Sequence, residues 1–234
     1  VINNAAKFRF MTGGQGRVPL VIRTQGGTGN GVAAQHSQSL EALFYHIPGL
    51  KLAIPSTPYD AKGLLKSAIR DNNPVLYFEH KRAYNLIRGD VPDGDFTVPI
   101  GEAVVRRPGS DISLISYGLS VHDCLEAAET MGEDGTSCEV VDLRTVSPMD
   151  TATLLESVKK TGRACIVHED NLTGGVGAEV AAIIAKDAFE YLDAPVQRVA
   201  APDVPSFPYS PTLEDALLPG PPDIVRAARE LAAY

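Results

Sequence analysis

A histidine next to a glycine-rich segment is the residue of this chain whose type and position could most directly do chemistry. His36 lies in AAQHSQS, shortly after the segment GGTGNG of Gly26–Gly31. Open α/β sheets bind ligands where a loop enters a helix at the end of a parallel strand. A histidine there can give or take a proton near neutral pH. Spacing alone slightly favours the alternative, in which His36 or Ser37 is an ordinary polar residue that caps a helix.

The other histidines and the glycine motifs indicate structure more than chemistry. The spacing of Gly26–Gly31 is G-x-G-x-G, which is not a dinucleotide-binding fingerprint. Gly174–Gly177 follows a predicted strand and opens a predicted helix, a geometry that can hold an anion. Tight packing of that helix on the sheet is the favoured interpretation, because no acidic residue follows at the matching distance. The histidines without metal-ligand spacing are His46, His80, His122 and His168, and His122 is expected at the surface.

The composition indicates a globular protein and argues against nucleic acid and membrane partners. Hydrophobic residues make up 44% of the chain, enough for a core, and the net charge is −8. Nucleic-acid binding needs clustered lysine and arginine, and a membrane span needs a longer apolar run than any found here. Cys124, Cys138 and Cys165 are scattered in apolar contexts. They are therefore expected to be reduced core thiols and not a disulfide frame or a zinc site.

Strand-like and helix-like segments alternate in the first part of the chain, which predicts parallel strands joined by helical crossovers. Predicted strands cover residues 18–23, 50–54 and 74–78, and predicted helices cover residues 37–45 and 59–70. Three strands are few for a parallel sheet that is covered on both faces. The apolar residues of segment 1–11 have helical spacing. We therefore expect that the sequence begins inside a helix whose upstream domain is absent.

The alternation stops from His80 to Gly109, where glycine, proline and aspartate predict a linker with a short strand at 97–100. It then resumes, with an N-cap expected at Asp150 and a helix stop at Gly162. The predicted strands are 112–117, 138–143, 164–168 and 196–200, and the predicted helices are 120–131, 151–160, 176–189 and 222–233. The predicted organisation is a partial domain over residues 1–84, a linker over 85–109 and a complete α/β domain over 110–234.

Two motifs carry a resemblance to a known family. HSQSLEAL, followed by HIPGLKLAIPSTPYDAKGLL, resembles the active-site histidine segment in the beta subunits of thiamin-diphosphate-dependent 2-oxo acid dehydrogenases. Asp142–Asp150 resembles the D-L-R-T-x-x-P-x-D signature of the same family. The resemblance spans nearly the whole chain but only the later part of a complete beta subunit. It implies a transketolase-like α/β fold, with a partial pyrimidine-binding domain and a complete C-terminal domain.

The resemblance assigns the catalytic role to His36 and not to His46. In the family this histidine lies over the thiazolium ring of the cofactor and helps to transfer the acyl group to a lipoyl arm. Thiamin chemistry also needs a glutamate that hydrogen-bonds the aminopyrimidine ring. The only carboxylate before Asp60 is Glu41, which does not match the glutamate motif. No cofactor-binding residue is therefore assigned, and this chain alone is expected to be inactive.

Two further ligands are implied by the resemblance. Thiamin diphosphate with magnesium would lie between this beta subunit and an alpha subunit, which carries the magnesium-binding motif in the family. A structural potassium ion would be bound by main-chain carbonyls, since oxygen ligands suit a hard cation. The matching carbonyls belong to Val18, Leu20, Val21, Ala68, Asp71 and Asn73. Without the resemblance, the turn at Asp71–Pro74 is an ordinary helix stop.

The implied function is oxidative decarboxylation of a 2-oxo acid and reductive acylation of a lipoyl group. The implied partners are an alpha subunit, a second beta subunit and a lipoyl acyltransferase core, in the bacterial cytoplasm or the mitochondrial matrix. FEHKRAY and VHEDNLTGG favour branched-chain and acetoin-type members over pyruvate ones, but the 2-oxo acid itself stays open.

Two other functions also stay open at the level of sequence. A chain without the cofactor glutamate could be a non-catalytic assembly module that binds partner subunits through its C-terminal domain. Another thiamin-family enzyme, such as an oxoacid:ferredoxin oxidoreductase, would be favoured by cluster-binding cysteines. The three cysteines of this chain do not have such an arrangement.

Overall fold

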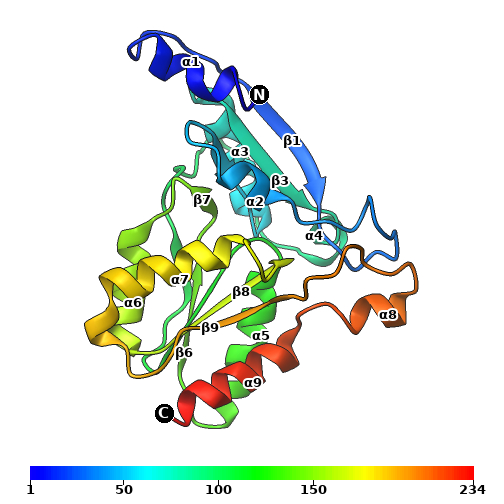
Figure 1. Ribbon diagram of the computed structural model, residues 1–234, viewed down its shortest axis with the longest axis vertical. Coiled ribbons are helices and arrows are strands. Elements are labelled where there is room, and N and C mark those ends of the chain that lie inside the picture. Colours follow the sequence, from blue (N-terminus) through cyan, green and yellow to red (C-terminus); the bar gives the residue numbers. More distant parts are fainter.

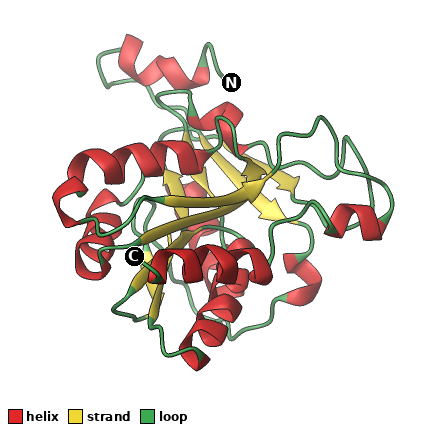
Figure 2. Ribbon diagram, turned by 60° about the horizontal axis from the view of Figure 1, so that its bottom comes forward, coloured by secondary structure: helices red, strands yellow, loops and turns green.

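Two sheets, one above the other, form the framework of the computed structural model, which describes residues 1–234 (Figure 1). The upper sheet has the strand order β1-β3-β2-β7, and the lower sheet has the order β4-β6-β5-β8-β9. Helices lie on both sides of the strands (Figure 2). This arrangement confirms the α/β fold that the alternating pattern predicted.

The first sheet is mainly parallel. β1, β3 and β2 run in the same direction, whereas β7 pairs with β2 in the antiparallel direction. β3 is central and begins with four consecutive buried residues, as expected of a strand covered on both faces. Its strands are β1 (Val21–Gly26), β2 (Lys51–Ala53), β3 (Val75–His80) and β7 (Thr145–Ser147). The helices of this part are α1 (Ala5–Met11), α2 (Glu41–Tyr45), α3 (Pro58–Arg70) and α4 (Ala83–Leu86).

The second sheet is a doubly covered α/β sheet with one antiparallel edge strand, β4, which pairs with β6. Its strands are β4 (Val104–Arg107), β5 (Ile112–Ser116), β6 (Cys138–Asp142), β8 (Ala164–Asn171) and β9 (Gln197–Ala201). Its helices are α5 (Ser120–Glu133), α6 (Thr151–Thr161), α7 (Val176–Asp187), α8 (Pro211–Asp215) and α9 (Pro221–Ala232). A 3₁₀ turn at Phe189–Tyr191 joins α7 to the segment before β9.

Helix ends follow the capping residues that the sequence shows. The Asp150 carboxylate accepts the N–H of Thr153 at 3.1 Å and starts α6. Gly162 ends the same helix with φ 70°, a conformation that costs glycine little. Pro221 and Pro222 occupy the first turn of α9, where no N–H donor is needed.

Three clusters of buried apolar residues form the core between the sheets and their helices. The largest contains 19 buried residues and joins Leu52 and Phe78 of the first sheet to residues of α6 and α7, such as Leu154 and Val180. The second contains 17 buried residues, lies between the second sheet and helices α5 and α9, and includes the three free cysteines. The third has six buried residues and places α3 on the first sheet. The core is therefore continuous between the first unit, which runs from α1 to α4, and the second unit, which runs from β4 to α9.

Two predicted elements differ from the structure. The predicted helix 37–45 begins only at Glu41, because the carbonyl of Gln38 accepts the N–H of Gly27 and the preceding residues form a turn. The predicted strand 97–100 is irregular, and Val98 is a buried loop residue that packs on α3. The sequence also gave no sign of β4 or β7, which are edge strands of three or four residues.

The segment Asp142–Asp150 crosses between the units. The buried Asp142 carboxylate accepts the Arg106 guanidinium at 2.8 Å and the Ser56 hydroxyl at 2.5 Å. Arg144 has φ 57° and pairs with the buried Asp60 of α3 at 2.9 Å, and Arg106 also pairs with Asp60. This signature therefore supplies the ion pairs and the strand β7 that join the second unit to the first.

Candidate functional site

His36 lies on a loop that leaves the carboxyl end of β1. The loop is closed at its base, where the Gly27 N–H donates to the Gln38 carbonyl at 2.9 Å. The Lys81 N–H donates to the Gly26 carbonyl at 3.1 Å, and the Lys81 ammonium donates to the carbonyl of His36. The imidazole itself is exposed. The structure thus places His36 in a turn ahead of α2 and not at a helix start.

Carboxylates of the second unit hold this loop. Glu214 of α8 is 1% exposed, and its Oε1 and Oε2 accept the N–H groups of Gly29 at 2.8 Å and Gly31 at 2.7 Å. Glu169 of β8 accepts the N–H of Thr28 at 2.6 Å. In Figure 1 the loop after β1 and the segment that contains α8 lie on the same side of the molecule. Carboxylates of the chain itself therefore occupy the backbone donors of the glycine segment.

Glu169 also binds His80, at the end of β3. His80 Nδ1 accepts the N–H of Arg82 at 3.2 Å, so Nε2 carries the proton and donates it to Glu169 Oε2 at 2.7 Å. Burial alone would raise the pKa of Glu169, but the hydrogen bonds from His80 and Thr28 hold it below the usual range. The sequence analysis gave His80 no partner, because Glu169 is far away along the chain.

Glu41 and Asp170 form a second, buried acidic pair at the junction of the units. The hydroxyl of Tyr117 donates to Glu41 Oε1 at 2.8 Å. Burial, with the nearby charge of Asp170, raises the pKa of Glu41 to about 8. Burial likewise raises the pKa of Asp170 to about 6. Both carboxyls therefore take up protons more readily than exposed acids do.

A small cavity lies between the glycine loop and the second sheet. It has a volume of about 40 Å³, and its lining includes Gly27, Glu41, His80, Tyr117 and Glu169. This volume suffices for a water molecule and is far smaller than the sites of drug-sized ligands, which have volumes of about 300–1,000 Å³. The imidazole of His36 does not line it.

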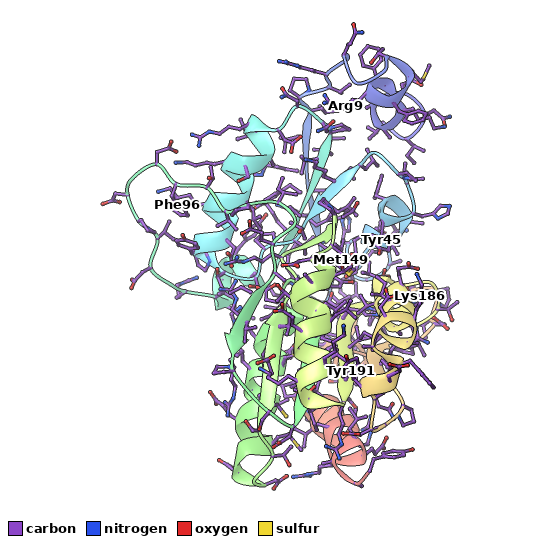
Figure 3. All side chains as sticks on the ribbon, turned by 90° about the vertical axis from the view of Figure 1, so that its left-hand side faces the viewer. Arg9, Tyr45, Phe96, Met149, Lys186 and Tyr191 are labelled. Carbon is purple, nitrogen blue, oxygen red and sulfur yellow. The ribbon has the colours of Figure 1, made fainter.

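His46 lines a different groove. This groove has a volume of about 630 Å³ and also contains Tyr45 and Met149. Figure 3 shows both of these side chains at the level where the two units meet. His36 and His46 therefore lie at different places on the surface, and both are exposed.

His168 and His122 are structural in different ways. His168 is fully buried without a hydrogen-bond partner for either ring nitrogen, and burial lowers its pKa to about 4. A Cβ at Gly175 or Gly177 would overlap its ring, which supports the packing interpretation of that glycine motif. His122 was expected at the surface, which is wrong: it is half-buried, and its Nε2 hydrogen-bonds the Ser56 carbonyl at 2.7 Å.

The two chain segments proposed for potassium, residues 18–21 and 68–73, lie side by side. The N–H of Val18 donates to the Asn72 carbonyl at 2.9 Å, and the N–H of Val75 donates to the Leu20 carbonyl at 2.8 Å. The Val18 carbonyl already accepts the N–H of Leu20 at 2.8 Å. The carbonyl oxygens of Val18 and Leu20 each accept one N–H already. A cation here would have to use their second lone pair.

The second of these segments contains the turn after α3. The Ala68 carbonyl accepts the N–H of Asp71 at 3.3 Å, and the Asp71 carboxylate accepts the N–H of Asn73 at 2.8 Å. The Lys51 ammonium pairs with the same carboxylate. An ammonium group thus already lies beside this turn, and burial of Asp71 is outweighed by these contacts, so that its pKa is lowered.

The side chains of residues 1–234 do not by themselves fit a diphosphate with its metal ion. No group of three or more histidine, cysteine, aspartate or glutamate side chains is placed to bind a metal ion. The amides of Thr28, Gly29 and Gly31, which could have bound a phosphate, are taken by Glu169 and Glu214. A diphosphate group would therefore need donors from another chain or from residues outside this sequence.

The fold and the loop define a transketolase-like chain. Residues 1–87 match the transketolase pyrimidine-binding domain, and residues 101–224 match the transketolase C-terminal domain. A split-gene transketolase, solved as an inactive beta4 tetramer, has the same fold, with a TM-score of 0.75 and 22% identity over 93% of this chain and 67% of that one.

Relatives give the particular family. The 2-oxoisovalerate dehydrogenase subunit beta of Bacillus subtilis is 50% identical over 100% of this chain and 72% of its own length. The acetoin:2,6-dichlorophenolindophenol oxidoreductase subunit beta of Cupriavidus necator is 50% identical over 98% of this chain and 68% of its own length. The pyruvate dehydrogenase E1 component subunit beta of B. subtilis is 47% identical over 100% of this chain and 71% of its own length. This chain belongs to the family of 2-oxo acid dehydrogenase E1 beta subunits.

Sequence reasoning missed the residues that hold the site together. Glu214 lies in a proline-rich segment that predicted no helix, and Glu169 was assigned no role by the sequence. The only signal for Glu169 was its place near the carboxyl end of a parallel strand, where α/β proteins form their sites. Nothing local marks Glu214.

Proposed function

We propose that this chain is the beta subunit of an enzyme that oxidatively decarboxylates a 2-oxo acid and reductively acylates a lipoyl group, together with an alpha subunit. The observation that carries the proposal is the place of His36. It lies exposed on a closed loop at the carboxyl end of β1, in a chain of the E1 beta family. The identities to the 2-oxoisovalerate, acetoin and pyruvate relatives are too similar to choose the 2-oxo acid.

The role proposed for His36 is proton delivery during acyl transfer. When a lipoyl disulfide is opened, one sulfur takes the acyl group and the other leaves as a thiolate that needs a proton. A histidine side chain can supply that proton at neutral pH. The exposed imidazole of His36 is accessible to a lipoyl arm that approaches from solvent.

Thiamin diphosphate, when bound, supplies the nucleophilic carbon and the electron sink for decarboxylation. We place it with its magnesium ion at the interface with the alpha subunit, a proposal supported by the glycine-segment amides, which are already bonded to Glu169 and Glu214. The proposal also includes a potassium ion, bound by the main-chain carbonyls of Val18, Leu20, Val21, Ala68, Asp71 and Asn73. A fall in thermal stability on exchange of potassium for sodium would support it.

The surface of the first unit suits a partner subunit. Phe10 of α1 is 92% exposed and Met11 is 75% exposed, on a helix that projects from the first sheet (Figure 1). Exposed apolar side chains that lie together mark interfaces. We propose contacts with the alpha subunit and a second beta subunit here, and recognition of the lipoyl acyltransferase core by the C-terminal unit. Interfaces of this obligate kind bury roughly 2,000 Å² or more.

The organisms of the relatives support a proposal for the compartment. The helices are all too short or too polar to span a lipid bilayer. Relatives come from bacteria and, in Oryza sativa, from a mitochondrial protein. We propose the bacterial cytoplasm or the mitochondrial matrix as the compartment.

The test compares two exposed histidines in the enzyme assembled with its alpha subunit. Two rates are measured: acylation of a lipoyl domain, and reduction of 2,6-dichlorophenolindophenol, which bypasses the lipoyl group. His36→Ala should lower the ratio of acylation to dye reduction by about 100-fold or more, the usual contribution of a proton donor. His46→Ala is the matched control and should leave the ratio within about twofold. Equal ratios in the two variants would remove the role proposed for His36.

A further inference from the structure

Glu214 is a buried carboxylate whose only partners are main-chain amides. It receives two hydrogen bonds, from Gly29 and Gly31, and no lysine, arginine or histidine lies within ion-pair distance of it. Taking a lone carboxylate out of water is costly unless it is hydrogen-bonded. Hydrogen bonds from N–H groups to an ionised oxygen are about twice as strong as neutral ones. The two amides therefore both stabilise Glu214 and are fixed by it.

The backbone of the loop is shaped to meet this carboxylate. Gly29 has φ 78° and Gly31 has φ 64°, conformations that direct the two N–H groups to the two oxygens of one side chain. Between these amides and His36, Ala33 also has a left-handed conformation, with φ 57°. A non-glycine residue keeps such a conformation only when its surroundings impose it.

The exposed imidazole of His36 makes no hydrogen bond or ion pair that would orient it. Only its main chain is bonded, through its N–H to the Ala33 carbonyl at 3.3 Å and through its carbonyl to Lys81. The direction of the ring is therefore set by the conformation of the loop from Gly27 to Gln38. In the glycine segment of that loop, the N–H groups of Gly29 and Gly31 donate to the Glu214 carboxylate. The N–H of Thr28 donates to Glu169.

We propose that Glu214 is a positioning residue for acyl transfer: from the C-terminal unit it holds the glycine segment in the conformation that presents His36 to the lipoyl group. The proposal rests on the role proposed above for His36. Glu214 lies 183 residues from Gly31 along the chain, so docking of α8 links the folding of the second unit to the geometry of the site. Misplacement of a reacting group by about 1 Å can cost about 100-fold in rate, so a modest loosening of the loop is enough to be measured.

The experiment uses the enzyme assembled with its alpha subunit and three variants. Glu214→Ala removes both acceptors, and Glu214→Gln keeps one amide oxygen in a side chain of the same shape. Asp215→Asn is the matched control, since Asp215 is the exposed neighbour on the same helix. Hydrogen exchange of the peptide that covers residues 27–32 is measured by mass spectrometry, beside the ratio of lipoyl acylation to dye reduction.

In Glu214→Ala, exchange of this peptide should be about tenfold faster or more, because the opening of the loop no longer breaks two charge-assisted hydrogen bonds. The acylation ratio should fall by about tenfold. Glu214→Gln should be intermediate in both measurements, and Asp215→Asn should match the parent enzyme. If Glu214→Ala does not fold, Glu214→Gln alone decides by the same two measurements.

Unchanged exchange in the Glu214 variants would overturn the proposal, and so would faster exchange with an unchanged acylation ratio. The His36→Ala variant distinguishes failure of the role proposed for His36 from failure of the role proposed for Glu214. If it keeps the parent ratio, the role of His36 fails, and positioning by Glu214 fails with it. If His36→Ala lowers the ratio and both Glu214 variants do not, only the role of Glu214 is overturned.

Discussion

The second sheet is buried by its own helices, whereas the first sheet shares its largest apolar cluster with the other unit. Ile112 and Leu114 of β5 face α5 and α9, and Ile115 faces α6 and α7, so the strand alternates between two complete layers. The first sheet has a cluster of its own with only six buried residues, under α3. Its other face packs on residues of the second unit.

This difference shows which unit carries the loop of the candidate site and which unit fixes it. The loop that carries His36 belongs to the unit with the smaller core of its own, and carboxylates of the other unit fix it. Functional loops are commonly placed on such a scaffold, because they need defined positions without being buried themselves. Substitutions in the second unit, in the first unit and at the junction between them test this comparison.

The largest effect on stability is expected at the junction. Arg106→Leu leaves the fully buried carboxylates of Asp60 and Asp142 without their shared guanidinium. Removal of one partner from a buried ion pair costs about 3–5 kcal/mol. Chemical denaturation of the parent and the variant measures this loss. Arg226→Ala is the control, because it breaks an exposed pair with Asp223 and should cost less than about 1 kcal/mol.

The next comparison is between the two cores. Leu114→Ala, in the second sheet, and Leu64→Ala, in the six-residue cluster, each remove a fully buried side chain. Both should lower the free energy of unfolding by about 2–5 kcal/mol. Leu114→Ala should cost more, because its cavity lies in the larger cluster and has less freedom to collapse. The reverse order, measured by urea denaturation, would contradict the comparison.

A smaller effect concerns pH. The pKa of Glu41 is raised to about 8, so the folded protein holds a proton that the unfolded chain releases at lower pH. The stabilisation from this proton is full below the usual glutamate pKa and is lost as the pH rises towards 8. Glu41→Gln should therefore flatten the decline of unfolding free energy between pH 5 and 8, by up to about 1.4 kcal/mol per pH unit. Glu156→Gln, an exposed change on α6, should keep the parent slope.

The smallest effect on folding should accompany a large effect on assembly. Phe10→Ser removes an almost fully exposed ring, so the free energy of unfolding of the isolated subunit should change by less than about 0.5 kcal/mol. Sedimentation over a range of concentrations should show weaker association than for the parent. Phe189→Ser, at an exposed aromatic residue of the second unit, is the control. Unaltered association in Phe10→Ser would argue against α1 as an interface.

The sequence predicted most of the fold because its elements have local signals. Runs such as Cys138–Leu143 and helices with apolar spacing, such as residues 59–70, correspond closely to β6 and α3. The N-cap at Asp150 and the C-cap at Gly162 were also predictable, because capping depends on residues a few positions apart. β7 was not predictable, because three residues pair with a strand of the other unit and have no pattern of their own.

The candidate site was predictable only in part. His36 was singled out by its neighbours in the sequence, together with the family resemblance. Its environment depends on Glu169, Glu214 and Lys81, and each of these contacts joins residues far apart along the chain. Glu41 was counted only as a carboxylate outside the glutamate motif. Its raised pKa comes from burial beside Asp170 and Tyr117, which only the packing of the two units creates.

The antiparallel pairing of β7 with β2 has a consequence during translation. The ribosome completes β1, β2 and β3 well before Thr145–Ser147 leave the exit tunnel. Until then the nascent first sheet has an unpaired edge at β2, and unpaired edges are templates for pairing with other chains. Domains usually fold in order of synthesis, amino-terminal part first. Here the edge of β2 stays unpaired until the β7 residues of the second unit have been made, so the first sheet is completed only after much of the second unit.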